Sequence, residues 1–426
     1  MKKNILIYPC GADNAIEVYD SIRYSVHFNV YGANSHDSIA DLYIENPIVH
    51  LPNISDENFI QKLNYVIDDY NIDLIFPTHD DIVYYFSQHL SDINTTIIGA
   101  DRKINELSRY KKKTYAFFEE FYFTPRIFTS ISDINEFPVF VKPDIGHGSL
   151  GAFKVNSSQE IEESVFLDNV VSEYLPGKEY TIDCFSDKNN QLLYAFPRER
   201  NIIRNGVSHK NIEPGKSTIN KCFEIAKKIN DQLDFKGLWF FQLKENKSGN
   251  LKLLEICPRI ATTMAFDRYK GVNLPLLTTF AYLDMDVKIR IFHKDVVLYR
   301  YSQTKPKYNY SYQKVFIDFD DTIIINQKVC LDAIAFIYQC KNENKKVYLI
   351  TKHEFDIIAT LNNYNIPESL FDEIICMDLN EDKYKYIKDS QFSIFIDNFY
   401  KERKEVFEYL NIPVFDVEGI KTLLNN

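Results

Sequence analysis

Short apolar runs alternate with longer amphipathic stretches over about the first hundred residues. The runs have the length of strands, and the stretches between them place apolar residues at helical spacing. Such alternation predicts βαβ units that build a parallel sheet, so we expect an α/β domain over residues 1–100. The predicted strands are 4–8, 27–31, 74–77 and 95–98, and the clearest predicted helices are 13–24 and 56–70.

The ends of these strands give little support for a bound dinucleotide. The segment 9–15 after the first strand has one glycine, whereas a dinucleotide fingerprint has three. Asp80 and Asp81 follow the strand 74–77, at the edge where open α/β sheets bind ligands. A solvated turn is the simpler interpretation of this acidic pair.

A glycine-rich segment interrupts two apolar runs at 137–155, and the first run ends at Lys142. Glycines let backbone N–H groups approach phosphate oxygens closely, and a lysine adds a point positive charge. The segment predicts a hairpin that folds over a polyphosphate, although an ordinary solvent-facing hairpin fits the same pattern. Its glycines are Gly146, Gly148 and Gly151.

The segments on either side of this hairpin predict helices. Residues 101–136 are typical of a helix followed by a proline-marked connection, and the lysines at 111–113 read as its solvated face. The segment 157–167 begins with serine and has an acidic first turn, which predicts a capped helix.

A further strand pair presents two glutamates. One strand ends at Glu173, a Pro-Gly turn follows, and Glu179 opens the next strand. Backbone groups near Glu173 can pair with an adenine edge, and the carboxylate of Glu179 can accept hydrogen bonds from ribose hydroxyls. The pattern fits a nucleoside site, and the alternative is a plain hairpin with two exposed glutamates.

Polar residues also gather on an apolar hairpin at 237–259. With the turn centred near 247–248, pairing sets Gln242 opposite Leu253, so Gln242 and Glu255 are diagonal neighbours on the face that also carries Cys257. A buried carboxylate needs a partner, and Mg²⁺ with oxygen ligands is the natural candidate. Arg259, just beyond, can fork onto a phosphate oxygen.

Three arginines lie close together at 198–204, next to the predicted nucleotide region. Guanidinium groups on one strand and loop suit a substrate carboxylate or phosphate. We therefore expect a substrate-binding role for Arg198, Arg200 and Arg204.

Composition narrows the class of protein. A chain of 426 residues exceeds one core and predicts two or three domains. A net charge of −11 argues against a nucleic-acid surface, and every apolar run is too short to cross a membrane. The seven cysteines have no paired spacing, so neither a disulfide framework nor a zinc site is indicated. Since the first apolar run is also too short for a signal peptide, we expect a cytoplasmic protein.

A new α/β pattern begins after a polar linker at 301–312. The strand that opens it ends in Asp318 and Asp320, which point to one side and can act as nucleophile and proton shuttle. A charged turn after an edge strand is the alternative, but later segments fit the first interpretation. The next strand ends at Thr351, Lys383 opens a predicted helix, and a third strand ends at Asp397.

In its order of motifs the first part of the chain, residues 1 to about 300, resembles the ATP-grasp superfamily, in its branch of carboxylate–amine ligases. The resemblance implies a Rossmann-like sheet over 1–100 and two α+β grasp subdomains over 101–300. It also implies that Arg259 contacts the transferred phosphate. The family usually has asparagine at the position of Cys257, and a thiol is a poor magnesium ligand. The implied ATP contacts are Lys142, Gly146, Gly148, Ser149, Gly151, Glu173 and Glu179, and the implied magnesium ligands are Gln242 and Glu255.

Residues 313–426 resemble the haloacid-dehalogenase superfamily, whose signature is matched by Asp318-Phe-Asp-Asp-Thr322. The resemblance implies that Asp318 is the nucleophile and Asp320 the acid/base, that Thr351 and Lys383 bind phosphate, and that Asp318, Asp320 and Asp397 hold magnesium. Asn398 stands where a second acid is common, and Glu402 is a candidate substitute. The gaps between motifs are too short for a cap domain.

Together these patterns predict a bifunctional α/β enzyme: an ATP-grasp fold followed by a capless Rossmann-like phosphatase domain, with ATP and Mg²⁺ as cofactors. The ligase would join a small carboxylate to a small amine. Alternatives are an ATP-grasp kinase or carboxylase without amide formation, and a nucleotide-sensing module. No nucleic-acid or membrane partner is expected, and a homodimer remains open.

Overall fold

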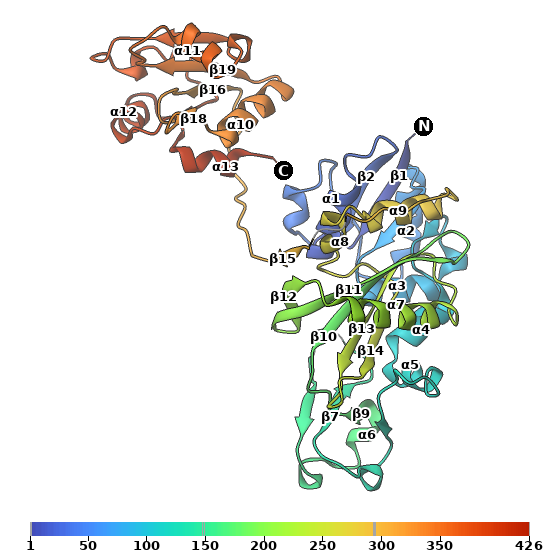
Figure 1. The fold of residues 1–426 in the computed structure, drawn as a ribbon. Coiled ribbons are helices and arrows are strands. Elements are labelled where there is room, and N and C mark those ends of the chain that lie inside the picture. Colours follow the sequence, from blue (N-terminus) through green and yellow to red (C-terminus); the bar gives the residue numbers. More distant parts are fainter. Residues whose placement is uncertain (1, 147, 149, 293–294, 426) are drawn as a thin grey trace. The chain divides into compact units, whose positions relative to one another are not determined.

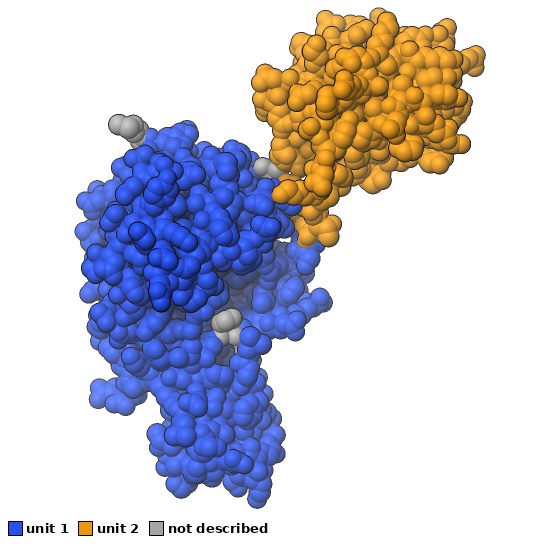
Figure 2. Space-filling view, turned by 180° about the vertical axis from the view of Figure 1, so that it is seen from behind, with its two compact units in different colours: residues 1–302 blue, residues 303–426 orange. Residues whose placement is uncertain are grey.

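The computed structural model describes residues 2–146, 148, 150–292 and 295–425. The chain divides into two compact units, Met1–Ser302 and Gln303–Asn426, which Figure 2 shows in blue and orange. Each unit is described by itself below. Ser149, one of the implied ATP contacts, lies outside the described residues.

The N-terminal part of the first unit contains the expected parallel sheet, which Figure 1 draws in blue with β1 and β2 labelled. Its strand order is β3-β2-β1-β4-β5. In β1 the residues Ile5, Leu6 and Ile7 are fully buried, because helices cover both faces of the sheet. The strands are β1 Lys3–Tyr8, β2 Phe28–Asn34, β3 Val49–His50, β4 Leu74–Pro77 and β5 Thr96–Ile97, and the helices are α1 Asp13–Ile22, α2 Phe59–Asp69 and α3 Asp80–Gln88.

The glycine-rich segment joins two antiparallel strands of a smaller sheet, in the order β6-β9-β7-β8. Gly148 and Gly151 have φ of +63° and +73°, in the left-handed region that glycine adopts without strain, whereas Gly146 does not lie in that region. The strands are β6 Ile127–Phe128, β7 Val139–Pro143, β8 Phe153–Val155 and β9 Asn169–Glu173, and the helices before and within this region are α4 Arg102–Arg109, α5 Lys111–Phe117 and α6 Val165–Asp168.

The capped helix predicted over 157–167 is wrong, because only its last residues join the short helix α6. The acidic side chains that suggested a first turn bond elsewhere. Glu160 accepts from the backbone N–H of Asn156 at 2.8 Å, and Glu163 accepts from that of Ile131 at 2.9 Å. These carboxylates hold neighbouring loops instead of a helix start.

A larger antiparallel sheet carries the second half of the first unit, in the order β14-β13-β10-β11-β12-β15. Its buried face packs around Trp239, whose ring stacks on Phe235 at 4.0 Å. The strands are β10 Glu179–Ser186, β11 Leu192–Arg204, β12 Val207–Ile212, β13 Gly237–Glu245, β14 Leu251–Cys257 and β15 Val297–Tyr299, and the helices are α7 Lys216–Asn230, α8 Ala265–Tyr269 and α9 Leu274–Tyr282.

The predicted register of β13 and β14 is corrected by a bulge. Gln242 pairs directly with Glu255, not with Leu253, because the register shifts between Gln242 and Leu243 and leaves Leu254 unpaired. The carbonyl of Leu254 instead accepts from the Tyr115 hydroxyl at 2.7 Å. The bulge therefore brings Gln242 and Glu255 closer together than the sequence predicted.

The second unit is built on a parallel sheet in the order β20-β19-β16-β21-β22. Among its described residues, the stretch from Thr322 to Thr351 holds only a short hairpin and α10, so no separate cap domain is inserted there. The elements are β16 Lys314–Ile317, β17 Ile324–Ile325, β18 Lys328–Val329, α10 Leu331–Asn342, β19 Lys346–Thr351, α11 Ile357–Asn363, β20 Glu373–Cys376, β21 Ser393–Ile396, α12 Tyr400–Leu410, β22 Val414–Phe415 and α13 Ile420–Leu423.

None of the described helices combines the length and apolar character needed to cross a membrane. All seven cysteines are free thiols.

Candidate active sites

A pocket of about 200 Å³ opens between the small sheet and the large sheet of the first unit, and Lys142 lies in it. The Lys142 ammonium donates to the Tyr115 hydroxyl and to the carbonyl of Leu254 at 3.1 Å. Burial, followed by the nearby ammonium of Lys111, lowers the pKa of Lys142 to about 7. Because burial disfavours the charged form of Lys142, an anionic ligand bound beside it would stabilise the ammonium.

Lys111 belongs to the same site, so its interpretation as part of a solvated face is wrong. Its ammonium donates to the carbonyls of Asp144 at 3.2 Å and Gly146 at 3.0 Å. Lys111 lines this pocket and also a second pocket that adjoins it. A sequence signal was present, since the aromatic residue Tyr115 lies four residues after Lys111 and therefore on the same face of a helix. The structure shows that Tyr115 is buried. Lysines 112 and 113 are exposed.

Arg200 ties together the strands that carry the predicted ribose and metal residues. Its guanidinium donates to Glu179, to Gln242 Oε1 at 2.8 Å and to the carbonyl of Gly206 at 2.5 Å. Glu179 also pairs with Lys244 at 3.2 Å. Glu179 therefore lines the pocket as a paired carboxylate.

Glu173, at the end of β9, lines the same pocket. Its Oε1 accepts from the backbone N–H of Arg126 at 3.0 Å, and its own N–H donates to the Arg126 carbonyl at 2.9 Å. The side chain of Glu173 thus holds the end of β9. Gly151, another of the implied ATP contacts, lies beside Pro143 and does not line this pocket.

The facing pair Gln242 and Glu255 supplies oxygen donors of the kind that Mg²⁺ prefers. Among the described residues, however, no group of three or more His, Cys, Asp or Glu side chains is arranged to hold a metal. Cys257 adds no hard ligand, because burial raises the pKa of its thiol well above the usual value and keeps it neutral. The residues fit a magnesium ion that takes most of its oxygens from a polyphosphate.

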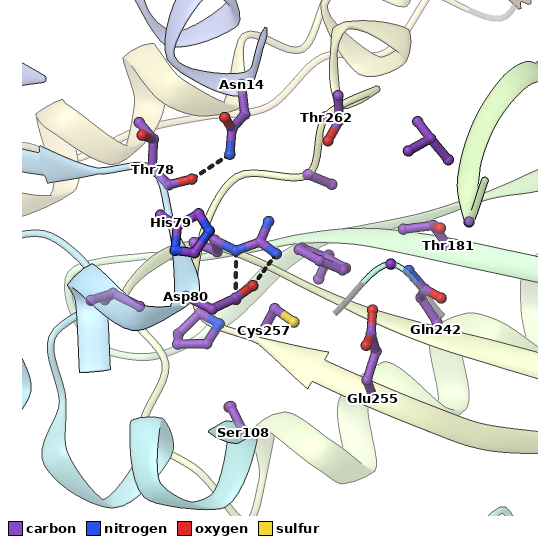
Figure 3. Close-up of a pocket in the computed structure, with 18 of the residues that line it drawn as sticks. Asn14, Thr78, His79, Asp80, Ser108, Thr181, Gln242, Glu255, Cys257 and Thr262 are labelled. Atoms are coloured by element: carbon purple, nitrogen blue, oxygen red, sulfur yellow. Dashed lines mark hydrogen bonds and ion pairs between the residues drawn. The ribbon is translucent and has the colours of Figure 1, made fainter. Parts of the chain in front are cut away.

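A second pocket, of about 270 Å³, adjoins the first and shares Lys111, Arg200, Gln242 and Glu255 with it. Its other wall comes from the N-terminal sheet. Figure 3 shows Asn14, Thr78, His79 and Asp80 on that wall, with Cys257 between Asp80 and the pair Gln242 and Glu255.

Arg259 and Asp80 form a two-point ion pair in this second pocket. Arg259 Nε and Nη2 donate to Asp80 Oδ1 and Oδ2, each at 2.6 Å. The interpretation of Asp80 as part of a solvated turn is therefore wrong, since its carboxylate is partly buried against a predicted phosphate contact.

Comparisons with known proteins agree with this architecture. Residues 165–304 match a family described as ATP-grasp in the biosynthetic pathway with Ter operon. D-alanine–D-alanine ligase of Fusobacterium nucleatum is 23% identical over 165 residues, which are 34% of this chain and 57% of that ligase. The chain thus spans little more than half the length of this curated relative.

Solved structures give the same result at the level of fold. The biotin carboxylase domain of Hydrogenobacter thermophilus 2-oxoglutarate carboxylase, solved as a dimer with MgADP and bicarbonate, has a TM-score of 0.60 at 14% identity, over 70% of this chain and 74% of its own. N5-carboxyaminoimidazole synthetase of Staphylococcus aureus with ADP has 0.58 at 16%, over 70% and 82%. L-amino acid ligase of Bacillus licheniformis has 0.51 at 19%, over 66% and 74%.

The first unit has an ATP-grasp fold. In this ATP-grasp unit the three predicted substrate arginines separate. Arg198 lines the second pocket, but it is buried and donates to Asp183 Oδ2 at 2.5 Å and Thr263 Oγ1 at 2.5 Å. Arg200 joins the two pockets, and Arg204 lies exposed at the end of β11, outside the lining of both.

The second unit gathers its own polar cluster at the carboxyl ends of β16, β19 and β21. Lys383 donates to Asp318 Oδ1 and Asp397 Oδ2, each at 2.6 Å, and Thr322 donates to Asp318 at 3.1 Å. Burial raises the pKa of both carboxyls, and the shared ammonium opposes this. Two buried carboxylates held by one cation also suit a magnesium ion.

Asp320 lies at the rim of this cluster. Its carboxylate contacts Thr351 Oγ1 at 3.4 Å and His353 Nδ1 at 3.0 Å, and the other ring nitrogen of His353 contacts Thr360 at 2.9 Å. Sequence reasoning did not single out His353. Lys383 begins a 3₁₀ turn, Lys383–Lys385, rather than a helix.

Glu402, on α12, pairs with Lys352 at 2.5 Å and lies near Asp397. It is 4% exposed, and its Oε2 has no hydrogen-bond partner among the described residues. Asp318, Thr351 and Asp397 lie at the ends of β16, β19 and β21, and Lys383 contacts both aspartates.

Proposed function

We propose that the ATP-grasp unit is an ATP- and Mg²⁺-dependent ligase that joins a carboxylate to an amine through an acyl phosphate. The observation that carries this proposal is the junction of two pockets through Lys111, Arg200, Gln242 and Glu255. One pocket takes the nucleotide, and the other takes the acceptor. A γ-phosphoryl group then has a direct path to an acid bound in the second pocket.

In the proposed reaction the acceptor carboxylate oxygen attacks the γ-phosphorus and ADP leaves. The amine nitrogen then attacks the acyl carbon, phosphate departs, and an amide remains. Lys142 and Lys111 offset phosphate charge, and Arg259 holds oxygens of the transferred group. A magnesium ion beside Gln242 and Glu255 would screen the charge on the polyphosphate.

The relatives support a ligase and leave the acceptor open. Two of them are named as ligases of alanine or amino acids, and others are named as carboxylases or carboxyaminoimidazole synthetases. The deciding experiment follows ADP and free phosphate separately, with ATP-Mg and panels of carboxylates, amines and bicarbonate. An amide with equal ADP and phosphate supports the ligase, whereas ADP release with bicarbonate alone supports a carboxylase.

The second unit is proposed to be a phosphatase of the haloacid-dehalogenase type. The support is the convergence of Asp318, Lys383 and Asp397 at the strand ends, with Thr351 and Asp320 beside them. Asp318 would attack phosphorus, and Asp320 would protonate the leaving oxygen. Mg²⁺-dependent release of phosphate from p-nitrophenyl phosphate, lost in Asp318→Asn, tests this role.

A pH dependence of ATP binding follows from the pKa of Lys142. Since that pKa is about 7, the side chain is mostly neutral at pH 8, while bound phosphates favour the ammonium. We expect ATP binding at pH 8 to take up a proton, and ATP affinity to fall by up to about 10-fold per pH unit above 7. Calorimetry in buffers of different protonation enthalpy measures the uptake. Lys142→Arg stays charged and should lose the uptake; an unchanged uptake would contradict the assignment.

A second expected result concerns Cys257. Asparagine at this position adds a hard oxygen donor beside Glu255, so Cys257→Asn should lower the Mg²⁺ concentration for half-maximal ADP release by about 2- to 5-fold. Cys257→Ala removes the thiol without adding oxygen and serves as the control. A collapse of activity in both variants would show that the thiol itself has a role.

A further inference from the structure

The geometry of Arg259 defines which of its N–H groups remain for a ligand. A guanidinium has five N–H groups. In the contacts of the described residues, Nε and one Nη2 group donate to Asp80, and one Nη1 group donates to the carbonyl of Ile260 at 2.8 Å. One N–H group of Nη1 and one of Nη2 remain. These two nitrogens form the outer edge of the guanidinium.

The plane of this guanidinium is also fixed. Its Cζ lies over the Phe240 ring at 5.4 Å, and the side chain is 15% exposed. With one edge held by Asp80 and one face covered by Phe240, the outer edge keeps a single direction. Because Arg259 lines the second pocket, that edge can receive two oxygens of an anion there.

We propose that Asp80 is a positioning residue for phosphoryl transfer: it holds the side edge of Arg259 so that the outer edge binds an oxyanion in the second pocket. This inference rests on the proposed ligase function. Asp80 comes from the N-terminal sheet and Arg259 from the segment after β14, so a residue of the sheet domain aims a side chain of the grasp domain.

Asp80 is itself held firmly enough for this role. It is the first residue of α3, and His79 caps that helix by accepting from the Asp81 N–H at 3.3 Å. The Asp81 side chain pairs with Arg109 at 2.5 Å. The strand before this turn, β4, is fully buried. These contacts restrict the movement of the backbone at Asp80, so its carboxylate keeps one position toward Arg259.

The competing explanation is that the ion pair only attaches the sheet to the loop after β14. Removing one partner of a partly buried pair is destabilising in either case, so stability cannot separate the two explanations. A double-mutant cycle can separate the two explanations. If Asp80 acts through Arg259, replacing Asp80 has no further effect once the guanidinium of Arg259 has been removed.

The test uses the full chain with Asp80→Asn, Arg259→Lys and the double variant. Asp80→Asn should lower kcat for ADP formation by about 100-fold with little change in KM for ATP, as expected for a misaimed group. Arg259→Lys, which cannot form a fork, should lower kcat similarly in the wild-type background and by less than about 3-fold in the Asp80→Asn background. Glu17→Gln, which loses the two-point ion pair between Glu17 and Arg268 outside both pockets, should stay near wild type.

The same cycle is measured by calorimetry with inorganic phosphate in the presence of ADP and Mg²⁺. The loss of phosphate affinity caused by Arg259→Lys should disappear in the Asp80→Asn background. An equal loss in both backgrounds, or a wild type that binds no phosphate, overturns the positioning role. If the wild type forms no ADP with any acceptor, the ligase proposal fails, and the phosphate cycle alone then decides the role of Asp80.

Discussion

Replacing Glu255 by glutamine is expected to lower ADP formation by roughly 100- to 1,000-fold and to leave hydrolysis of p-nitrophenyl phosphate unchanged. Three described carboxylates, Glu173, Glu179 and Glu255, line the pocket that holds Lys142. Glu179 forms ion pairs with Arg200 and Lys244, and Glu173 accepts a hydrogen bond from the backbone N–H of Arg126. Glu255 is therefore the carboxylate that we propose as a magnesium ligand. The measurements are a coupled ADP assay and phosphate release on one protein preparation.

Glu245→Gln is the matched control for this variant. Glu245 also lies on the hairpin of β13 and β14 and accepts from the Tyr180 hydroxyl at 2.9 Å, but it lines neither principal pocket. Its replacement should cost stability without removing ADP formation. Loss of both activities in a still-folded Glu255→Gln protein would contradict two independent sites.

Several elements of this fold follow from local sequence alone. Strands β1, β4, β16 and β21 are buried on both faces, so each appears as an unbroken apolar run that a reader of the sequence can find. The residues that end such strands are equally visible, which is why Asp318 and Asp397 could be named beforehand. Their shared contact with Lys383 was not predicted, because Lys383 lies on a 3₁₀ turn and not at a strand end.

The register of the hairpin formed by β13 and β14 could not be predicted in this way. The bulge at Leu254 depends on the Tyr115 hydroxyl and the Lys142 ammonium, which come from more than a hundred residues away and bond to its carbonyl. The position of Asp80 in the site was missed for the same reason. Its ion-pair partner is Arg259, 179 residues later in the chain.

Lys111 represents a different kind of error. The prediction treated a run of three lysines as one surface, although a helix turns by about 100° per residue and sends them in different directions. Lys111 lies on the face of Tyr115, while its two neighbours are exposed. Charge runs on helices therefore need to be read residue by residue.

Replacing Asp318 by asparagine is expected to leave amide formation intact and to make a phosphorylated amide accumulate. We propose that the two units act in sequence on one metabolite: the ligase joins a phosphorylated amine to a carboxylate, and the phosphatase then removes the phosphate. Asparagine keeps the shape beside Lys383 and Thr322 but cannot attack phosphorus. The ester bond to the amide product then survives.

Mass spectrometry of the product after turnover with the true substrates provides the measurement. Wild type should give an amide without phosphate, and Asp318→Asn should give the same amide carrying one phosphoryl group. Asp321→Asn is the control, because Asp321 is an exposed neighbour outside the cluster around Lys383. The same unphosphorylated product from wild type and Asp318→Asn would contradict the proposal that the two units act in sequence, because Asp318 would then have no part in forming that product.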